Sequence, residues 1–404
     1  MSLALRYEVI EMGVYNLIGE RIDDSTPTIR SYFDTEMGDT VTKVKNEITE
    51  PCLVFPVTTD VHIGADVPQV FNQSVDNIAK FCSLVKCDFV ACLGDLIDGA
   101  SAKATSLATA FTATQKLREI PVPYIFAQGN HDNNIYSGSA STDKFDMLEI
   151  FKTLFNSVRN VQVNPSENGT DYCFDMELGV RVVVLNACNV KRANNYAYGS
   201  STAEWLSGVA LDTDMPVLLL EHLSSISTQV WNNNNPTGAS GITSAINSFI
   251  SGGGTVVQLS GHSHVDLAFI TPWMSVMFVC NKCLQANTST TEMQKVSGYI
   301  DVIGSPTRTE GTATEDCWTV CVLKPNSKEL ATIRFGAGID RYFHYNPIAP
   351  TTLTSKLTGV TWSSSNESVA TVSNGVVTGV ASGTCAILAK DATGNYEAWI
   401  ITVS

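Results

Sequence analysis

The sequence predicts an α/β protein in which two mixed β-sheets pack together between layers of helices. From about residue 50, short apolar runs alternate with amphipathic stretches, which is typical of parallel strands joined by helices. After residue 172, β-rich runs follow one another without intervening helices, which indicates a second sheet packed on the first. Five of the six histidines follow apolar runs, and the carboxyl ends of parallel strands are where such folds bind their ligands.

The elements can be placed in chain order. Apolar runs predict buried strands that end just before polar motifs, at residues 53–57, 89–93, 122–127, 217–220 and 256–259. Amphipathic stretches predict helices at residues 68–85, 102–119, 143–155 and 240–250. The strands assigned to the second group lie at residues 172–177, 181–186, 275–279, 298–303, 318–323 and 330–335. Residues 1–49 show only weak periodicity, and we infer no role for them.

Length and composition limit the function classes. A chain of 404 residues exceeds one ordinary core, so a large unit plus a smaller module is expected. With 44% hydrophobic and 16% charged residues, the chain can bury a sizeable core. A net charge of −15 opposes binding to a nucleic-acid polymer, whose phosphates attract Lys and Arg. A small anionic substrate held by metal ions fits this charge.

Targeting signals leave the compartment undecided. The chain has no apolar run of about 18 residues or more, so we expect no transmembrane segment, and its start lacks the basic and apolar stretches of a signal peptide. The eleven cysteines are odd in number and mostly lie in apolar segments. That placement favours reduced thiols in the core over a disulfide framework.

A boundary is predicted between residues 345 and 350, where two prolines flank a short break. We expect three parts: an N-terminal segment at 1–49, a catalytic domain at 50–346 and a small all-β module at 347–404. In the module, Ser, Thr, Val and Gly alternate with period two, and turn signals occur at Asn374-Gly375 and Thr393-Gly394.

The polar motifs carry the ligand types of a site for two metal ions. They are Asp60-x-His62, Gly94-Asp95-x-x-Asp98, Gly129-Asn130-His131-Asp132, Glu221-His222 and Gly261-His262-x-His264. Two divalent ions about 3.5–4 Å apart can hold both oxygens of an in-line phosphoryl displacement, and this needs a carboxylate shared between them. Mixed nitrogen and oxygen ligands suit Mn, Fe or Zn better than Ca. The motifs contain no thiolate.

Read in this order, the motifs resemble those of the calcineurin-like metallophosphoesterase family over roughly residues 50–270. The resemblance implies an α/β/β/α sandwich and a hydrolase that cleaves phosphate mono- or diesters with a metal-activated hydroxide. It implies that Asp60, His62 and His264 bind the first metal and that Asp95 bridges both. Asn130, His222 and His262 would complete the second metal site.

The resemblance also implies two catalytic residues that are not ligands. His131 would stabilise charge on the phosphate or protonate the leaving oxygen as a general acid. Asp98 matches an acidic residue that orients this histidine in some relatives, and Asp132 competes for that role. An acidic partner would fix the useful tautomer of the ring.

Each feature also has a plainer interpretation. A histidine or an Asp-Gly turn after a strand is often only a cap or a satisfied core group. The Cys280/Cys283 and Cys317/Cys321 pairs suit either a structural zinc site or buried free thiols. We expect His344 to be an ordinary residue of the terminal strand or of the linker, and Glu221 to support His222 or to be solvated. The loops at 189–200 and 231–236 are either substrate walls or exposed turns.

At residues 360–387, the segment VTWSSSNESVATVSNGVVTGVASGTCAI resembles the bacterial immunoglobulin-like group 2 domain. Such domains run longer at their N-terminal end, so a first strand is either missing or supplied by the catalytic domain. The module suggests a carbohydrate or cell-surface contact and a cell-envelope, extracellular or virion setting. It also supports the competing hypothesis of a non-catalytic binding or adhesion protein.

Overall fold

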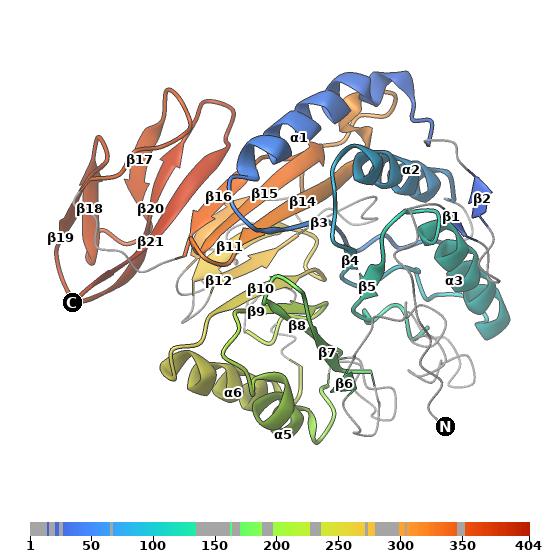
Figure 1. Ribbon diagram of the computed structural model, residues 1–404, viewed down its shortest axis with the longest axis horizontal. Helices are drawn as coiled ribbons and strands as arrows, with labels where there is room; N and C mark the ends of the chain where they lie inside the picture. The colour runs from blue at the N-terminus through green and yellow to red at the C-terminus, as the bar shows by residue number, and fades with distance from the viewer. Residues whose placement is uncertain are drawn as a thin grey trace.

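The computed structural model describes residues 14–15, 21–23, 27–64, 68–134, 162–163, 170–187, 197–226, 236–270, 274–278, 299–303, 305–345 and 352–404. Two large mixed sheets dominate the described part of the chain, with helices on their outer faces (Figure 1). This is the predicted α/β/β/α arrangement. No helix among the described residues is long and apolar enough to cross a membrane.

One sheet has nine strands in the order β17-β20-β21-β16-β15-β14-β3-β4-β5. Their bounds are β3 (Leu53–Thr58), β4 (Val90–Cys92), β5 (Tyr124–Phe126), β14 (Cys317–Lys324), β15 (Glu329–Gly336), β16 (Arg341–His344), β17 (Thr361–Ser364), β20 (Gly383–Lys390) and β21 (Tyr396–Val403). The β3, β4 and β5 strands are parallel, so their carboxyl ends meet at one edge.

The other sheet has eight strands in the order β13-β11-β12-β10-β9-β8-β7-β6. Their bounds are β6 (Gln162–Val163), β7 (Tyr172–Asp175), β8 (Arg181–Leu185), β9 (Val217–Glu221), β10 (Val256–Ser260), β11 (Asp266–Ile270), β12 (Met274–Met277) and β13 (Tyr299–Ile303). The β8, β9, β10 and β12 strands run parallel. Two short ribbons, β1 (Val14–Tyr15) with β2 (Arg21–Asp23) and β18 (Ala370–Ser373) with β19 (Val376–Gly379), complete the strands described.

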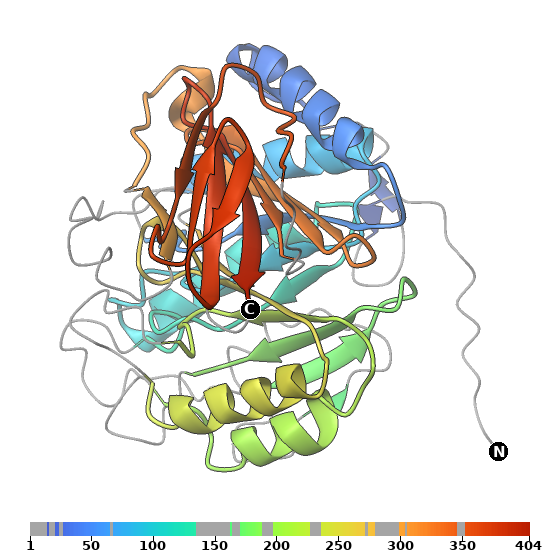
Figure 2. The ribbon, with the colours of Figure 1, turned by 90° about the vertical axis from the view of Figure 1, so that its left-hand side faces the viewer.

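The helices cover the apolar outer faces of the two large sheets. Their bounds are α1 (Asp34–Glu47), α2 (Pro68–Leu84), α3 (Lys103–Leu117), α5 (Thr202–Trp205) and α6 (Ala239–Ser251), with short 3-10 turns η1 (Ser31–Phe33) and η5 (Ala313–Glu315). The first three pack on the outer face of the nine-stranded sheet, and α5 and α6 cover the eight-stranded sheet (Figures 1 and 2).

The core between the sheets explains why they face each other. Phe55 and Phe89 stack there with ring centroids 4.6 Å apart, and both lie against apolar residues of the other sheet such as Leu218 and Leu259. Their chain neighbours Val54 and Val90 point to the helices instead. Since neighbouring strand residues face opposite sides, each strand contributes to two cores and is buried on both faces.

The predicted strands and helices match the structure to within a few residues wherever it describes them. The predicted helix at 143–155 lies outside the described residues, as do residues 189–196 and 231–235 of the two candidate substrate loops. Residues 34–47, for which the sequence suggested no element, form α1. This helix buries Met37 and Val44 against the nine-stranded sheet.

The C-terminal module is joined to the catalytic part through its strands. Its strand β21 pairs in parallel with β16, so Arg341 lies opposite Tyr396 and His344 opposite Trp399. One face of β20 and β21 contributes Ala386, Leu388, Ala398 and Ile400 to the core between the two large sheets. The other face packs in a small core of the module's own. A strand from the preceding part of the chain thus lies beside β21, which favours the alternative in which the catalytic domain supplies the module's first strand.

Candidate metal centre

The predicted ligands gather where the parallel strands end. Asp60 and His62 follow β3, Asp95 follows β4, and Asn130 follows β5, all from the nine-stranded sheet. His222 follows β9, and His262 and His264 follow β10, from the eight-stranded sheet. The site therefore lies across the boundary between the two sheets.

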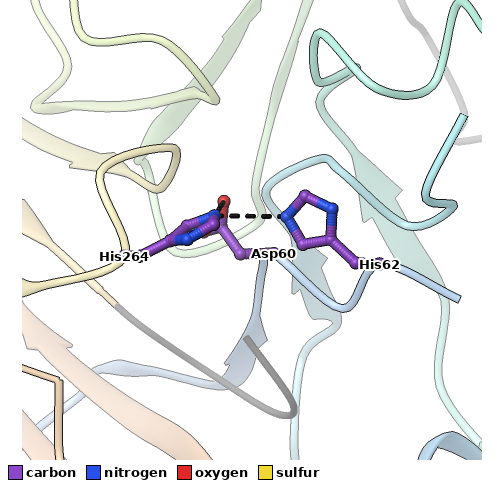
Figure 3. Close-up of side chains that lie close together, drawn as sticks. All are labelled: Asp60, His62 and His264. Carbon is purple, nitrogen blue, oxygen red and sulfur yellow. Dashed lines mark hydrogen bonds and ion pairs between the residues drawn. The ribbon is translucent and has the colours of Figure 1, made fainter. Parts of the chain in front are cut away.

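The first group of candidate ligands consists of Asp60, His62 and His264 (Figure 3). The Nε2 atoms of His62 and His264 are 3.2 Å apart, and His264 Nε2 lies 3.4 Å from Asp60 Oδ1. Ligand atoms that share an ion at about 2.0–2.2 Å lie roughly 3–3.5 Å from one another, so these separations fit a single cation.

The second group contains Asp95, His222 and His262, with Asn130 beside them. His222 Nε2 lies 3.1 Å from both Asp95 Oδ2 and Asn130 Oδ1. The same Asp95 oxygen lies 3.7 Å from His62 Nε2 of the first group. Asp95 thus stands between the two groups, which is the position that a shared carboxylate requires.

Hydrogen bonds to the protein fix which ring nitrogen of His222 faces the site. Its Nδ1–H donates to the carbonyl oxygen of Leu93 at 2.7 Å, which directs Nε2 toward the other ligands. A hydrogen bond of this kind is the usual partner of a metal-binding imidazole. Asp60 is held in a similar way, because the Thr59 hydroxyl donates to its Oδ2 at 2.9 Å and the His262 N–H donates to its Oδ1 at 3.0 Å.

Five of the proposed ligands have left-handed backbone conformations. Their φ angles are 54° at Asp60, 49° at His62, 52° at Asp95, 72° at His262 and 54° at His264. This region is uncommon for residues other than glycine, and its use costs about 1–3 kcal/mol per residue. Strain concentrated at one group of residues is typical of a functional site, where the surrounding structure holds it in place.

Two motif glycines allow the loops to approach one another. A Cβ atom at Gly94 would lie 2.6 Å from the Gly129 nitrogen and 2.8 Å from His222 Nδ1. A Cβ atom at Gly129 would collide with the Asp95 carboxylate. Any side chain at either position would push apart the loops that carry the ligands.

Burial and neighbouring charges shift the pKa values of the candidate ligands. Burial opposes charge on His222, but the adjacent Asp95 carboxylate prevails and raises the pKa of His222 to about 9. Burial and the neighbouring His131 and His264 rings lower the pKa of His62 to about 4, although Asp95 acts in the opposite direction. Burial and the neighbouring His222 ring lower the pKa of His262 to about 3. Although burial acts in the opposite direction, His222 and His131 hold the pKa of Asp95 well below its usual range.

His131 lies beside the ligands, with Nε2 3.9 Å from Asp95 Oδ2. It could reach a cation together with His62 and Asp95, but at a longer distance than the ligand pairs above. Its Nδ1–H donates to the main-chain carbonyl oxygen of Asp98 at 2.7 Å. The Asp98 carboxylate lies 3.8 Å from His62 Nδ1. The orienting contact expected from the Asp98 side chain is thus made by its main chain.

Asp132, the competitor for that role, has a different one. Its buried carboxylate accepts hydrogen bonds from the N–H groups of Asp95 (2.9 Å), Leu96 (2.8 Å), Ile97 (3.2 Å) and Gly129 (2.8 Å). It therefore holds the turn that carries Asp95. Burial and the nearby Asp95 charge raise the pKa of Asp132 to about 7, and the N–H donors act against that rise.

Glu221 is fully buried, so the solvated alternative is wrong. Its carboxylate accepts hydrogen bonds from the Tyr198 hydroxyl at 2.9 Å, the Ser225 N–H at 2.6 Å and the Gln258 amide. It thus supports the segment that carries His222. Thr59 and Gln258 touch a ligand or its neighbour but belong to no motif, so nothing in the sequence marked them. Tyr198 lies in the candidate substrate loop at 189–200, where it is buried and bonded to Glu221.

The remaining candidates lie away from this centre. His344 is in β16, where its Nε2 lies 2.6 Å from Glu397 Oε1. Cys317 and Cys321 are buried thiols of β14 that form no disulfide, and burial raises the pKa of both. Cys280 and Cys283 lie outside the described residues, so the zinc alternative for that pair stays open.

Comparison with known proteins agrees with this geometry. The calcineurin-like phosphoesterase profile matches residues 54–266, more than half of the chain. The chain belongs to the calcineurin-like phosphoesterase family. It is accordingly a metal-dependent phosphoric ester hydrolase. The bacterial Ig-like domain (group 2) profile matches residues 349–402.

One solved structure with a TM-score above 0.5 shows the same fold at low sequence identity, and two others are similar at lower scores. A dimetal phosphatase from Danio rerio is 14% identical, with a TM-score of 0.51 over 72% of this chain and 99% of its own. PhoD is 12% identical (TM-score 0.49; 88% and 72% coverage), and purple acid phosphatase PPD1 from yellow lupin is 14% identical (TM-score 0.44; 71% and 52% coverage). No curated protein matches the sequence.

Proposed function

We propose that this phosphoesterase uses two divalent metal ions, Mn, Fe or Zn, to hydrolyse phosphate mono- or diesters of small substrates. The observation that supports this most strongly is the position of Asp95, whose Oδ2 lies 3.1 Å from His222 Nε2 and 3.7 Å from His62 Nε2. One carboxylate thus lies within reach of both ligand groups.

The residues fit such ions by their chemistry as well as their spacing. Imidazole nitrogens and carboxylate or amide oxygens suit Mn, Fe and Zn. We assign Asp60, His62 and His264 to one ion, Asn130, His222 and His262 to the other, and Asp95 to both. When bound, the ions supply a nucleophile by lowering the pKa of a water molecule, and they neutralise charge on the phosphate.

The protein's own groups would complete the reaction. His131 has a side chain 12% exposed, in contrast to the buried Asp95 beside it at 1%. Its Nδ1–H is committed to the Asp98 carbonyl oxygen, so only Nε2 can face a substrate. We assign it the protonation of the leaving oxygen or the stabilisation of charge on the phosphate. Asp98 holds the ring through its main chain and faces His62 with its carboxylate.

The direct test is metal content by mass spectrometry of the purified protein, followed by hydrolysis of chromogenic phosphate mono- and diesters with added Mn. We expect two metal ions per chain and turnover of at least one ester. Absence of both bound metal and turnover would contradict the proposal and favour a non-catalytic binding or adhesion protein.

The substrate range can be narrowed with a panel of nucleotides, cyclic nucleotides, phospholipid head groups and phosphopeptides. Substrate choice usually depends on loops around the metal centre. The sequence places two such loops at 189–200 and 231–236. We propose the module at 347–404 as a contact for carbohydrate or a cell surface, and binding of the intact protein to a glycan array would test it.

A further inference from the structure

The first ligand group depends on the alignment of the two sheets. Asp60 and His62 come from the nine-stranded sheet, whereas His264 comes from the eight-stranded sheet. A shift between the sheets would change the distances from His264 to its partners. A contact that joins the sheets next to His264 would therefore set this geometry.

Such a contact lies two residues beyond His264. Asp266 is the first residue of β11, and its carboxylate forms an ion pair with Arg334 of β15 in the other sheet. Arg341 of β16 adds a second cation, with its guanidinium 3.8 Å from Asp266 Oδ1. We call these three residues the cross-sheet cluster.

All three side chains are removed from solvent. The exposed fractions are 0% for Asp266, 3% for Arg334 and 1% for Arg341. Buried charges are poorly solvated, so each depends on its partner and resists displacement from it. Hydrogen bonds to charged partners also have narrow geometry, in contrast to apolar packing, which tolerates sliding. The cluster is therefore suited to fixing position.

The main chain between Asp266 and His264 is tightly constrained. His264 has a left-handed backbone, with φ 54°, and Val265 between them is fully buried. The carbonyl oxygen of His264 also accepts a hydrogen bond from the Ser305 hydroxyl at 2.5 Å. A displacement of Asp266 would be transmitted directly to the His264 ring.

We propose that Arg334, supported by Arg341, is a positioning residue for the metal ligand His264, acting through Asp266. This inference rests on the proposed function, because it assumes that His264 binds a metal ion. Arg334 touches neither metal nor substrate in this account. Its effect is on how well the first ligand group is arranged before a metal ion arrives.

A control exists in a second arginine–aspartate pair among the described residues, in which the arginine is buried and the aspartate is exposed. Arg181 is 7% exposed and donates to Asp175 at 2.6 and 2.9 Å. It begins β8, at the end of the strand opposite to the metal centre. Its removal should loosen the fold without moving a ligand.

The test is titration of metal-free protein with Mn(II), monitored by electron paramagnetic resonance, for wild type, Arg334→Met, Arg334→Lys and Arg181→Met. Changes in the groups that orient metal ligands typically cost about 10–100-fold in metal affinity. For Arg334→Met we expect a loss of at least about tenfold at one of two Mn sites and a weaker spin coupling between the ions. Arg334→Lys should recover part of the loss, and Arg181→Met should bind both ions as wild type does.

Each other outcome has a definite meaning. Normal Mn affinity and coupling in Arg334→Met would overturn the positioning role while leaving the proposed function intact, as would equal losses in Arg334→Met and Arg181→Met. A wild type that binds no Mn would refute the proposed function and the positioning role together. If Arg334→Met does not fold, Arg341→Met decides, with a smaller loss at the same site expected and no loss counting against the proposal.

Discussion

The Nδ1–H of His131 donates to the main-chain carbonyl oxygen of Asp98 at 2.7 Å. A main-chain acceptor fixes the ring and its tautomer without using a side chain, so the Asp98 carboxylate is left to face His62 at 3.8 Å. A substitution of the Asp98 side chain would therefore largely preserve the hydrogen bond that orients the His131 ring.

The general-acid role of His131 can be separated from metal binding. His131→Ala should keep both metal ions and lose about a hundredfold or more in kcat, the range typical of general acid catalysis. The loss should shrink for esters with good leaving groups such as nitrophenolate, which need little protonation. The measurement is kcat against leaving-group pKa, with metal analysis, and Asp98→Asn is the control because it keeps the carbonyl acceptor. Equal losses across the series would indicate phosphate stabilisation instead, and loss of a metal ion would make His131 a ligand.

Asp132 should matter for stability and metal affinity together. An Asn at this position replaces one acceptor oxygen by a donor and leaves buried N–H groups of the Asp95 turn unsatisfied. We expect Asp132→Asn to lower the free energy of unfolding by about 1–3 kcal/mol and to weaken Mn binding. Urea unfolding of the metal-free protein and Mn titration measure the two effects. If the unfolding free energy and the Mn affinity both equal those of the wild type, the turn that carries Asp95 does not depend on the Asp132 carboxylate.

The junction between module and catalytic part should depend on pH through Glu397. Burial raises the pKa of Glu397, but His344, the Lys356 N–H and the Ser355 hydroxyl together outweigh burial and lower the pKa below its usual value. A lowered pKa in the folded state adds stability at pH above the ordinary glutamate value, and this stability is lost as the pH falls through the folded value. Glu397→Gln should therefore destabilise the protein at about pH 7 and much less at about pH 4. A pH-independent difference in unfolding free energy would contradict this sign.

The module should be needed for a stable catalytic domain. Removing residues 347–404 would expose the edge of β16 and take Leu388, Tyr396 and Ile400 out of the core between the large sheets. Residues that remain in this core, such as Phe343 against Tyr396, would lose their apolar cover. Each such side chain contributes about 1.5–3 kcal/mol when buried. We expect a large fall in melting temperature or aggregation, in contrast to Val380→Thr at an exposed position of the module. A truncated protein as stable as the full chain would make the module an independent attachment.

The sequence predicted which polar residues lie together better than it predicted their surroundings. Asp60, Asp95 and His264 lie close to one another as expected, because polar motifs that follow apolar runs are a local feature of the sequence. Their roles as metal ligands come from the family resemblance and stay predictions. The helix α1 was missed because its sequence, DTEMGDTVTKVKNE, buries only a few side chains. The partner of His131 could not be predicted, since every residue type has a main-chain carbonyl group.

Pairing between strands far apart in the sequence could not be predicted either. The parallel pair of β16 and β21 joins residues about fifty positions apart, and nothing in either strand specifies the other. The buried ion pair of Asp266 and Arg334 also depends on how the two sheets stack. Such contacts arise from tertiary packing, to which period and propensity are insensitive.

The central claim is that Asp95 is shared between two metal ions, and Asp95→Asn tests it most directly. The measurement is metal stoichiometry by mass spectrometry together with kcat on a chromogenic phosphate ester, with folding checked by circular dichroism. A neutral amide cannot balance two cations, so we expect a folded protein with lowered occupancy at both sites and no detectable turnover. An Asp95→Asn enzyme that keeps two ions and its activity would contradict the account.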